Sequence, residues 1–250
     1  MPPICLHLVI ARDAATRLGH STVDQNLGSY LLGSTLPDFH IMMGQPRERT
    51  HFFDLAKEPA ESGIKPFLKA YPELSEGAGL ADDTRALVSG YLCHLATDEV
   101  WIIDIYRPLF GPASPLGDEP MANLLDRTLQ YELDLRSRED EGDMSQIRAL
   151  LGRLNLSADI GPIDASAVRR WHERVSSASN RVPTWDDFPA FAERFLVPFK
   201  KVEPEPLERF LASLPAKREW VLRYVGRERI EAFREKAVSH SVTAAQEYLN

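Results

Sequence analysis

The stretch "GYLCHLATDEVW", residues 90–101, carries a histidine and an aspartate four residues apart inside a long apolar run. Residues four apart share one face of a helix, so a helix here brings His94 and Asp98 together. A helical wheel that starts at Leu87 places both on one side with Trp101, and the opposite side is apolar too, with Val88, Leu92, Val100 and Ile103. The pattern therefore predicts a helix in the middle of a bundle, with a polar pair in its core.

Helical periodicity continues on both sides of this stretch, and no series of alternating strands is present. We expect helices at about 4–18, 22–36, 64–71, 84–110, 119–137, 144–155, 164–179, 185–199, 205–213 and from 216 onward, and a loop at 39–50. Proline and glycine breaks separate most of them. The fold class expected is all-α, a multi-helix bundle that forms one domain over 1–250, with two parts at 1–112 and 118–250.

Composition narrows the function classes. The net charge of −8 and the isoelectric point near 5.4 argue against a broad nucleic-acid surface, which requires a basic face. Cys5 and Cys93 form no disulfide framework. No apolar stretch is long enough for a transmembrane segment, and the first residues lack the basic region of a secretory signal. A cytoplasmic location is the expectation.

The His94–Asp98 pair has two interpretations. One is a hydrogen-bonded structural pair in a core, which is common. The other gains weight from three more residues of the first part: His7 on an apolar helix face, Asp38 at the end of the second predicted helix, and His51 just before "FF". Each of these also has an ordinary structural explanation. Together, three histidines and two carboxylates form a donor set that suits a first-row divalent metal.

The order of these residues resembles the zinc-dependent phospholipase C family, which is related to the single-strand nucleases. The segments that carry the resemblance are "CLHLVIARDA", "LLGSTLPDFH" followed by "RTHFFD", and "GYLCHLATDEVW", within residues 1 to 107. The family is all-helical and hydrolyses phosphodiesters with up to three zinc ions. The resemblance implies that Asp38, His51, His94 and Asp98 are ligands of one metal, and that Asp98 bridges to a second metal held with His7. It also implies that Asp38 orients or deprotonates a water molecule.

The chain departs from the family in two places. The family's mature chains begin with a tryptophan whose amino group is a ligand, whereas here Met1, Pro2 and Pro3 precede His7. The family's later histidine and HxxxE motif also have no counterpart, because only His172 and His240 follow His94 and neither has glutamate four residues on. We therefore expect one metal ion or two, either zinc or another divalent metal such as manganese, iron or nickel.

The function expected is hydrolysis of a small phosphoester or a phospholipid headgroup by metal-activated water, which makes the chain a phosphodiesterase like phospholipase C. Arg47 and Arg49 suit phosphate recognition, or form a solvated pair on the loop. The alternative function is a non-catalytic helical protein with a structural metal and a partner-binding second part. A histidine–aspartate phosphohydrolase is disfavoured because no "HD" dipeptide occurs.

Two expectations concern the second part of the chain. The helical sequence from 216 onward packs either on the bundle or on a second copy of the chain, so a homodimer stays open. Glu132 and Asp134 are interpreted as a solvated helix face.

Overall fold

The computed structural model describes residues 2–52, 62–75, 79–117, 120–154, 158–196 and 203–250. Over these residues the fold is all-α, as predicted, and their one β-type contact is an isolated bridge between Ile160 and Ile163. The predicted helix ends at 119, 155 and 197–199 lie outside the described residues. None of the described helices is long and apolar enough to cross a membrane.

The helices of the first part are mostly short, except for two. They are α1 (Ile4–Leu18), α2 (Ser21–Gln25), α3 (Leu27–Gly33), the 3₁₀ turn η1 (Leu36–Phe39), α4 (His40–Met43), α5 (Glu48–His51), α6 (Ile64–Ala70), α7 (Pro72–Ser75), α8 (Asp82–Val100), the π-helical segment η3 (Trp101–Tyr106) and α9 (Arg107–Leu109).

The helices of the second part run on to the end of the chain. They are α10 (Pro120–Ser137), α11 (Glu141–Gly152), α12 (Ala165–Asn180), the 3₁₀ turn η4 (Trp185–Asp187), α13 (Phe188–Leu196), α14 (Pro204–Ala212), α15 (Leu214–Val225) and α16 (Arg227–Leu249).

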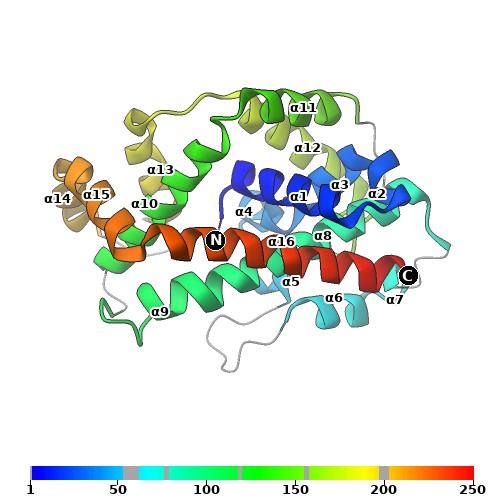
Figure 1. Ribbon diagram of the computed structural model, residues 1–250, viewed down its shortest axis with the longest axis horizontal. Coiled ribbons are helices and arrows are strands. Elements are labelled where there is room, and N and C mark those ends of the chain that lie inside the picture. Colours follow the sequence, from blue (N-terminus) through cyan, green and yellow to red (C-terminus); the bar gives the residue numbers. More distant parts are fainter. Residues whose placement is uncertain (1, 53–61, 76–78, 118–119, 155–157, 197–202) are drawn as a thin grey trace.

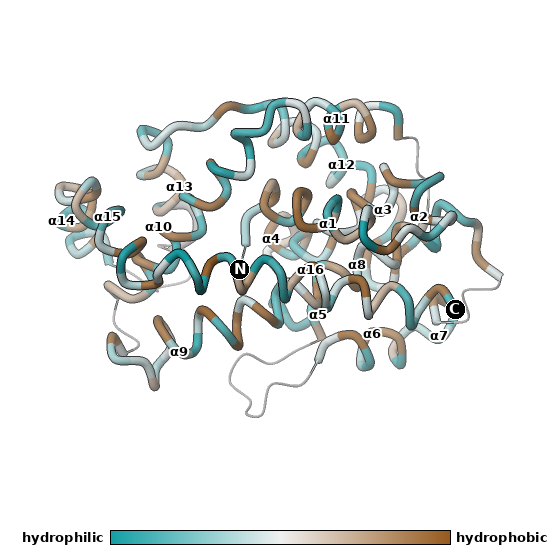
Figure 2. The backbone as a smooth tube through the Cα atoms, in the orientation of Figure 1, coloured by the Kyte–Doolittle hydropathy of each residue, from teal (hydrophilic) through white to brown (hydrophobic). Residues whose placement is uncertain are grey.

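Helix α8 is the central element of the molecule (Figure 1). Every residue from Ala86 to Asp98 is buried, because α3 and α16 cover it from different sides. The outer helix α16 instead alternates hydrophobic and hydrophilic residues along its length (Figure 2). The predicted central helix is thus confirmed, and its apolar surround explains how the polar pair comes to be buried.

Two glycines allow α3 and α8 to cross at backbone contact. A Cβ atom on Gly90 would overlap the carbonyl oxygen of Tyr30, and one on Gly33 would overlap that of Leu87. The close crossing brings the next carbonyl of the chain, that of Ser34, to 2.8 Å from Nδ1 of His94. The packing of two helices therefore orients one side chain of the polar pair.

Three predicted elements differ from the structure. The helix expected at 22–36 is divided into α2, α3 and η1, and α2 is capped by the side chain of His20, which accepts a hydrogen bond from the Thr22 amide. The loop expected at 39–50 contains the short helices α4 and α5. The helix expected from 216 onward is broken at Gly226, whose φ of 80° no other residue type adopts easily.

The second part of the chain completes the core of the first. Helix α16 packs against α8 and α1, so the C-terminal sequence follows the first of its two expected packings. Ala244, Tyr248 and Leu249 belong to the same hydrophobic cluster as Leu87 and Tyr91. A second cluster combines η3 with α10, α13, α14 and α15. The boundary near residue 112 is therefore not a boundary in the packing.

Candidate metal centre

Five predicted ligands meet beside α8, around the side chains of His94 and Asp98. His7 comes from α1, Asp38 from η1, His51 from α5, and His94 and Asp98 from α8. Four of them are at most 1% exposed, and Asp38 is 6% exposed. Two groups drawn from these five, His7–His94–Asp98 and Asp38–His51–His94, place their donor atoms close enough to hold an ion.

The ring nitrogens of His51 and His94 face each other. Their Nε2 atoms are 3.2 Å apart, while Nδ1 of His94 lies 2.8 Å from the Ser34 carbonyl and Nδ1 of His51 lies 3.2 Å from the Arg47 carbonyl. Nδ1 of His51 also lies 3.0 Å from the Thr50 hydroxyl. In the tautomer with a proton on each Nδ1, both rings have a backbone acceptor and Nε2 is the lone-pair atom. Two lone pairs at this distance require a proton or a cation between them.

Carboxylate oxygens complete the arrangement around these nitrogens. Oδ2 of Asp98 lies 3.3 Å from Nε2 of His51 and 3.6 Å from Nε2 of His94. Oδ1 of Asp38 lies 3.7 Å and 3.9 Å from the same two nitrogens. Ligand atoms at about 2.1 Å from a tetrahedral zinc ion are roughly 3.4 Å apart. The five separations are therefore close to those of a coordination shell.

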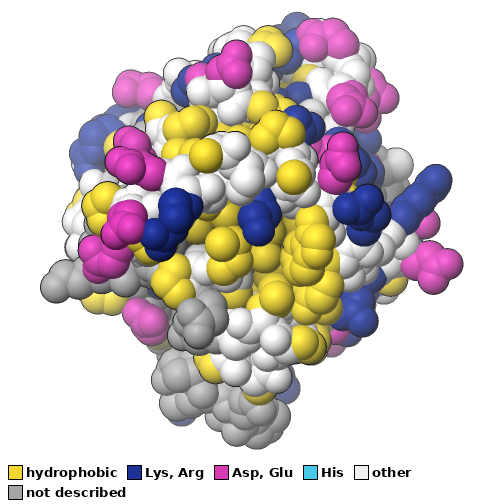
Figure 3. Space-filling view, turned by 90° about the vertical axis from the view of Figure 1, so that its left-hand side faces the viewer, with side chains coloured by type: hydrophobic (Ala, Val, Ile, Leu, Met, Phe, Trp, Pro, Cys, Tyr) yellow, Lys and Arg dark blue, Asp and Glu magenta, His cyan; other side chains and the backbone are white. Residues whose placement is uncertain are grey.

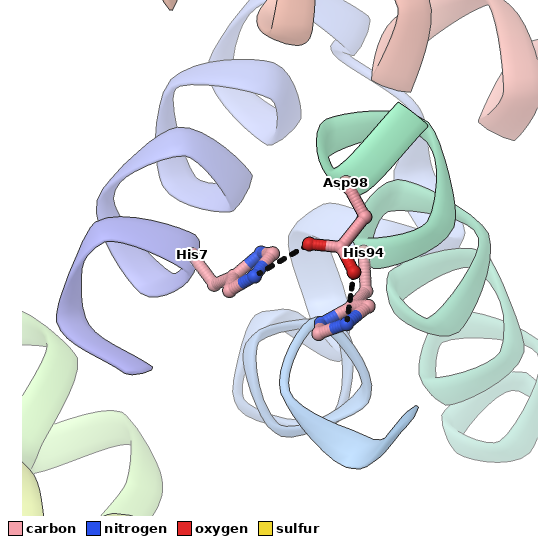
Figure 4. A group of neighbouring side chains, drawn as sticks. All are labelled: His7, His94 and Asp98. Atoms are coloured by element: carbon pink, nitrogen blue, oxygen red, sulfur yellow. Dashed lines mark ion pairs between the residues drawn. The ribbon is translucent and has the colours of Figure 1, made fainter. Parts of the chain in front are cut away.

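Asp98 also reaches a third histidine. Its Oδ1 atom lies 3.5 Å from Nε2 of His7, so each oxygen of this carboxylate is directed to a different histidine (Figure 4). The His7 ring stacks on that of His94 at a centroid distance of 4.0 Å. The two oxygens of Asp98 therefore link His7 to the pair formed by His51 and His94.

Unpaired polar atoms inside the cluster indicate that a cation fits. Both ring nitrogens of His7, Oδ1 of Asp38 and Oδ1 of Asp98 are buried without a hydrogen-bond partner among the described residues. Leaving such a group unsatisfied costs about 1–3 kcal/mol, and more for a charged group. Coordination of divalent ions would satisfy Oδ1 of Asp38, Oδ1 of Asp98 and one ring nitrogen of His7, so the buried His and Asp groups can hold a metal.

Burial and neighbouring charges set the protonation of the cluster. Burial, together with the charge of Arg47, lowers the pKa of His51 to about 3. Burial has the largest effect on His7, and together with the charge of His94 it lowers the pKa of His7. Burial also acts to lower the pKa of His94, but Asp98 and Asp38 outweigh it and raise that pKa. Opposed by burial, His94 nevertheless holds the pKa of Asp98 well below its usual value.

The two predicted phosphate-binding arginines lie in different environments. Arg47 is 10% exposed, and its Nη2 donates a hydrogen bond of 2.7 Å to Oδ2 of Asp98. Arg49 is exposed on α5 and does not line the cavity described below. The structure therefore brings Arg47 into the cluster and leaves Arg49 outside it.

The backbone after His51 is held in an unusual conformation. Phe52 adopts φ = 56°, and it is the only residue other than glycine with a positive φ among those described. Such a conformation costs about 1–3 kcal/mol and requires support from its surroundings. Phe52 packs on Phe67 and Tyr71, and Tyr91 donates a hydrogen bond to the Thr50 carbonyl. These contacts fix the end of α5 and so the position of His51.

A cavity of about 600 Å³ adjoins the cluster. Asp38, His40 and Arg47 line it on the side of the cluster, and α10, α12 and α13 supply much of the remaining wall. On the face at the α13–α15 end of the molecule, hydrophobic side chains gather with basic ones among them (Figure 3). The second part of the chain thus contributes to the surroundings of the candidate site.

Helix α10 supplies buried polar groups to this cavity that sequence reasoning missed. Asp126 accepts hydrogen bonds from Nε1 of Trp101 at 3.3 Å and from Gln130 at 2.7 Å. Asp134, predicted to be solvated, is only 5% exposed. It accepts from the Cys5 amide at 3.0 Å and from Arg138 at 2.9 Å. The available signal was the spacing of four between these polar residues, which marks one face of a helix.

Comparison with known proteins identified no relative. None of the protein-family models, curated proteins or solved structures with which the chain was compared matches it.

Proposed function

We propose that this protein is a metal-dependent phosphoester hydrolase similar to zinc-dependent phospholipase C. The observation that supports this most is the facing Nε2 atoms of His51 and His94, flanked by one oxygen each from Asp38 and Asp98. Nitrogen and oxygen donors of this kind suit zinc, and also manganese, iron and nickel. We propose zinc, with one ion between His51 and His94 and a second in reach of His7.

A bound divalent ion would lower the pKa of a water molecule and polarise a phosphoryl oxygen. His51 and His94 would hold the ion, and the backbone carbonyls near their Nδ1 atoms would keep both rings in the binding orientation. Asp38 is the most exposed of the five and also lines the cavity. With Oδ1 directed to the ion, the other oxygen of Asp38, Oδ2, would be the group that orients the attacking water or accepts its proton.

The cavity favours a small substrate. Its volume matches sites that enclose small molecules, and Arg47 at its inner end suits a phosphoryl group. We propose a small phosphoester or a phospholipid headgroup as the substrate class. A reducing, cytoplasmic location is part of the proposal, and it agrees with two buried free thiols at Cys5 and Cys93.

Metal analysis and turnover test this function together. We expect the purified protein to bind one or two equivalents of zinc and to hydrolyse bis(p-nitrophenyl) phosphate, and we expect a chelator to abolish the hydrolysis. His51→Gln should lose zinc affinity by more than about 100-fold, since even outer partners of ligands contribute 10–100-fold. His172→Gln is the matched control, because His172 belongs to neither candidate metal group and its Nε2 lies 2.7 Å from the Leu151 carbonyl. A wild-type protein that binds no transition metal would end this proposal.

A second candidate is a non-catalytic protein in which the metal stabilises the fold and the second part binds a partner. The near-complete burial of His51 and His94 favours it. Asp38→Asn separates the two candidates when zinc content is measured in the same sample. Catalysis predicts a variant that retains zinc and loses turnover by about 100-fold or more. A structural metal predicts no turnover even in the wild type, with a large loss of melting temperature in His94→Ala.

A further inference from the structure

Arg47 donates its hydrogen bond to the Asp98 oxygen that faces the two histidines. This oxygen is Oδ2, which lies 3.3 Å from Nε2 of His51 and 3.6 Å from Nε2 of His94. The other oxygen, Oδ1, has no hydrogen-bond partner among the described residues. A residue that orients a metal-binding carboxylate would be expected to donate its hydrogen bond to the oxygen that the metal leaves free. Arg47 instead occupies the oxygen that an ion between the two histidines would use.

Charge makes simultaneous occupation costly. An ion at about 2.1 Å from Oδ2 would lie within a few ångströms of a guanidinium nitrogen that is 2.7 Å from the same atom. Two cations at that distance repel strongly in a buried site, because little water screens them. The cavity that Arg47 already lines gives its side chain room to move.

We propose that Arg47 takes the place of the cation on Asp98, and that metal binding releases its guanidinium into the cavity to form a binding site for a tetrahedral oxyanion. This inference deepens the proposed function, since it rests on metal binding by the same cluster. A divalent ion and a released guanidinium at the same cavity would both attract an anionic ester or phosphate. Guanidinium groups match the geometry of phosphate oxygens.

Zinc affinity tests the exchange directly. Arg47→Gln removes the competing charge, so we expect it to bind zinc about tenfold more tightly than the wild type, a coupling of ordinary size between two sites. Arg47→Lys retains a competing charge and should bind zinc with an affinity near that of the wild type. Arg49→Gln is the matched control on the exposed side of α5, and its zinc affinity should not change. Zinc binding to Arg47→Gln that equals the wild type or is weaker would show that Arg47 orients Asp98, and would overturn the proposal.

Phosphate binding tests the released state. Titration calorimetry with inorganic phosphate should show binding to the zinc-loaded wild type, at least tenfold weaker binding to the zinc-free wild type, and none to zinc-loaded Arg47→Gln. Equal phosphate affinity with and without zinc would contradict the release of Arg47. A wild type that binds no zinc would instead contradict the proposed function. If zinc and phosphate bind as expected but no ester is hydrolysed, only the proposed hydrolase activity would be contradicted.

Discussion

Single residues show how the bundle keeps polar groups neutral in its interior. Tyr131 lies on α10 against Trp185, Phe188 and Phe191, and its hydroxyl donates a hydrogen bond of 2.7 Å to the Thr184 carbonyl. Burial, reinforced by the charge of Asp187, raises the pKa of Tyr131 to about 12. The protonated phenol is therefore the form that the folded state stabilises.

This shift predicts a stability change at alkaline pH. The unfolded chain releases the Tyr131 proton near pH 10 and the folded chain near pH 12, so its contribution is complete below pH 10 and is lost as the pH rises through that window. We expect the free energy of unfolding, measured by urea titration at pH 9, 10 and 11, to fall more steeply in the wild type than in Tyr131→Phe. Identical slopes would show that another tyrosine carries the effect.

The residues of the candidate centre differ in how far sequence alone could place them. His94 and Asp98 share a helix face in an apolar run, so their meeting was predictable from spacing. His7, Asp38 and His51 lie on separate elements, so their convergence was inferred from the chemistry of the donor set and from an ordered resemblance, not from spacing. The contact of Arg47 with Asp98 could not be predicted, because the segment of Arg47 was expected to be a loop and the contact depends on the turn into α5.

At the scale of the element, the crossing of α3 and α8 depends on two positions without side chains. Gly90→Ala would push a methyl group into the Tyr30 carbonyl and towards the Ser34 amide. We expect a loss of about 3 kcal/mol in the free energy of unfolding, together with weaker zinc binding, because the Ser34 carbonyl would shift from His94. Gly152→Ala is the control, since nothing lies within 4 Å of its added Cβ and it should be nearly neutral. Similar stability in both variants would mean that the crossing is not close.

The start of α1 depends on a carboxylate from the second part of the chain. Pro3 offers no side-chain cap, so Asp134 on α10 accepts the Cys5 amide instead and also pairs with Arg138. We expect Asp134→Ala to lose roughly 2 kcal/mol in urea unfolding, because a buried amide loses its acceptor and Arg138 loses its carboxylate partner. Asp134→Asn keeps an oxygen for the amide and should lose less. Equal losses would assign the whole effect to the charge.

Element boundaries were predictable where glycine and proline end a helix, as at Gly19 after α1. Boundaries were not predictable where tertiary contacts determine where a helix ends. The division of residues 22–36 places the Ser34 carbonyl beside His94, and the π-helical segment after Val100 turns Trp101 towards Asp126. Both contacts join residues distant in sequence, which helical periodicity does not report.

At the scale of the whole molecule, the two hydrophobic clusters share their helices. Helix α8 lies in the first cluster, and its continuation η3 enters the second. Helix α16 contributes to both clusters, and Lys236 on it forms an ion pair of 2.8 Å with Asp104 on η3. A disturbance of either cluster therefore reaches the other through continuous helices, so we expect one cooperative unfolding transition.

Zinc should raise the midpoint of that single transition. A ligand that binds only the folded state stabilises it by about 2.7 kcal/mol at a concentration of 100 times its Kd, which corresponds to roughly 5–10 °C for a chain of this size. Scanning calorimetry with and without zinc measures the shift, which His94→Ala should lack and the control His172→Gln should retain. Because the candidate centre lies in the first cluster while α16 joins both, the whole transition should move together. Two separate transitions, of which zinc moves only one, would show instead that residues 1–112 and 118–250 unfold as independent units.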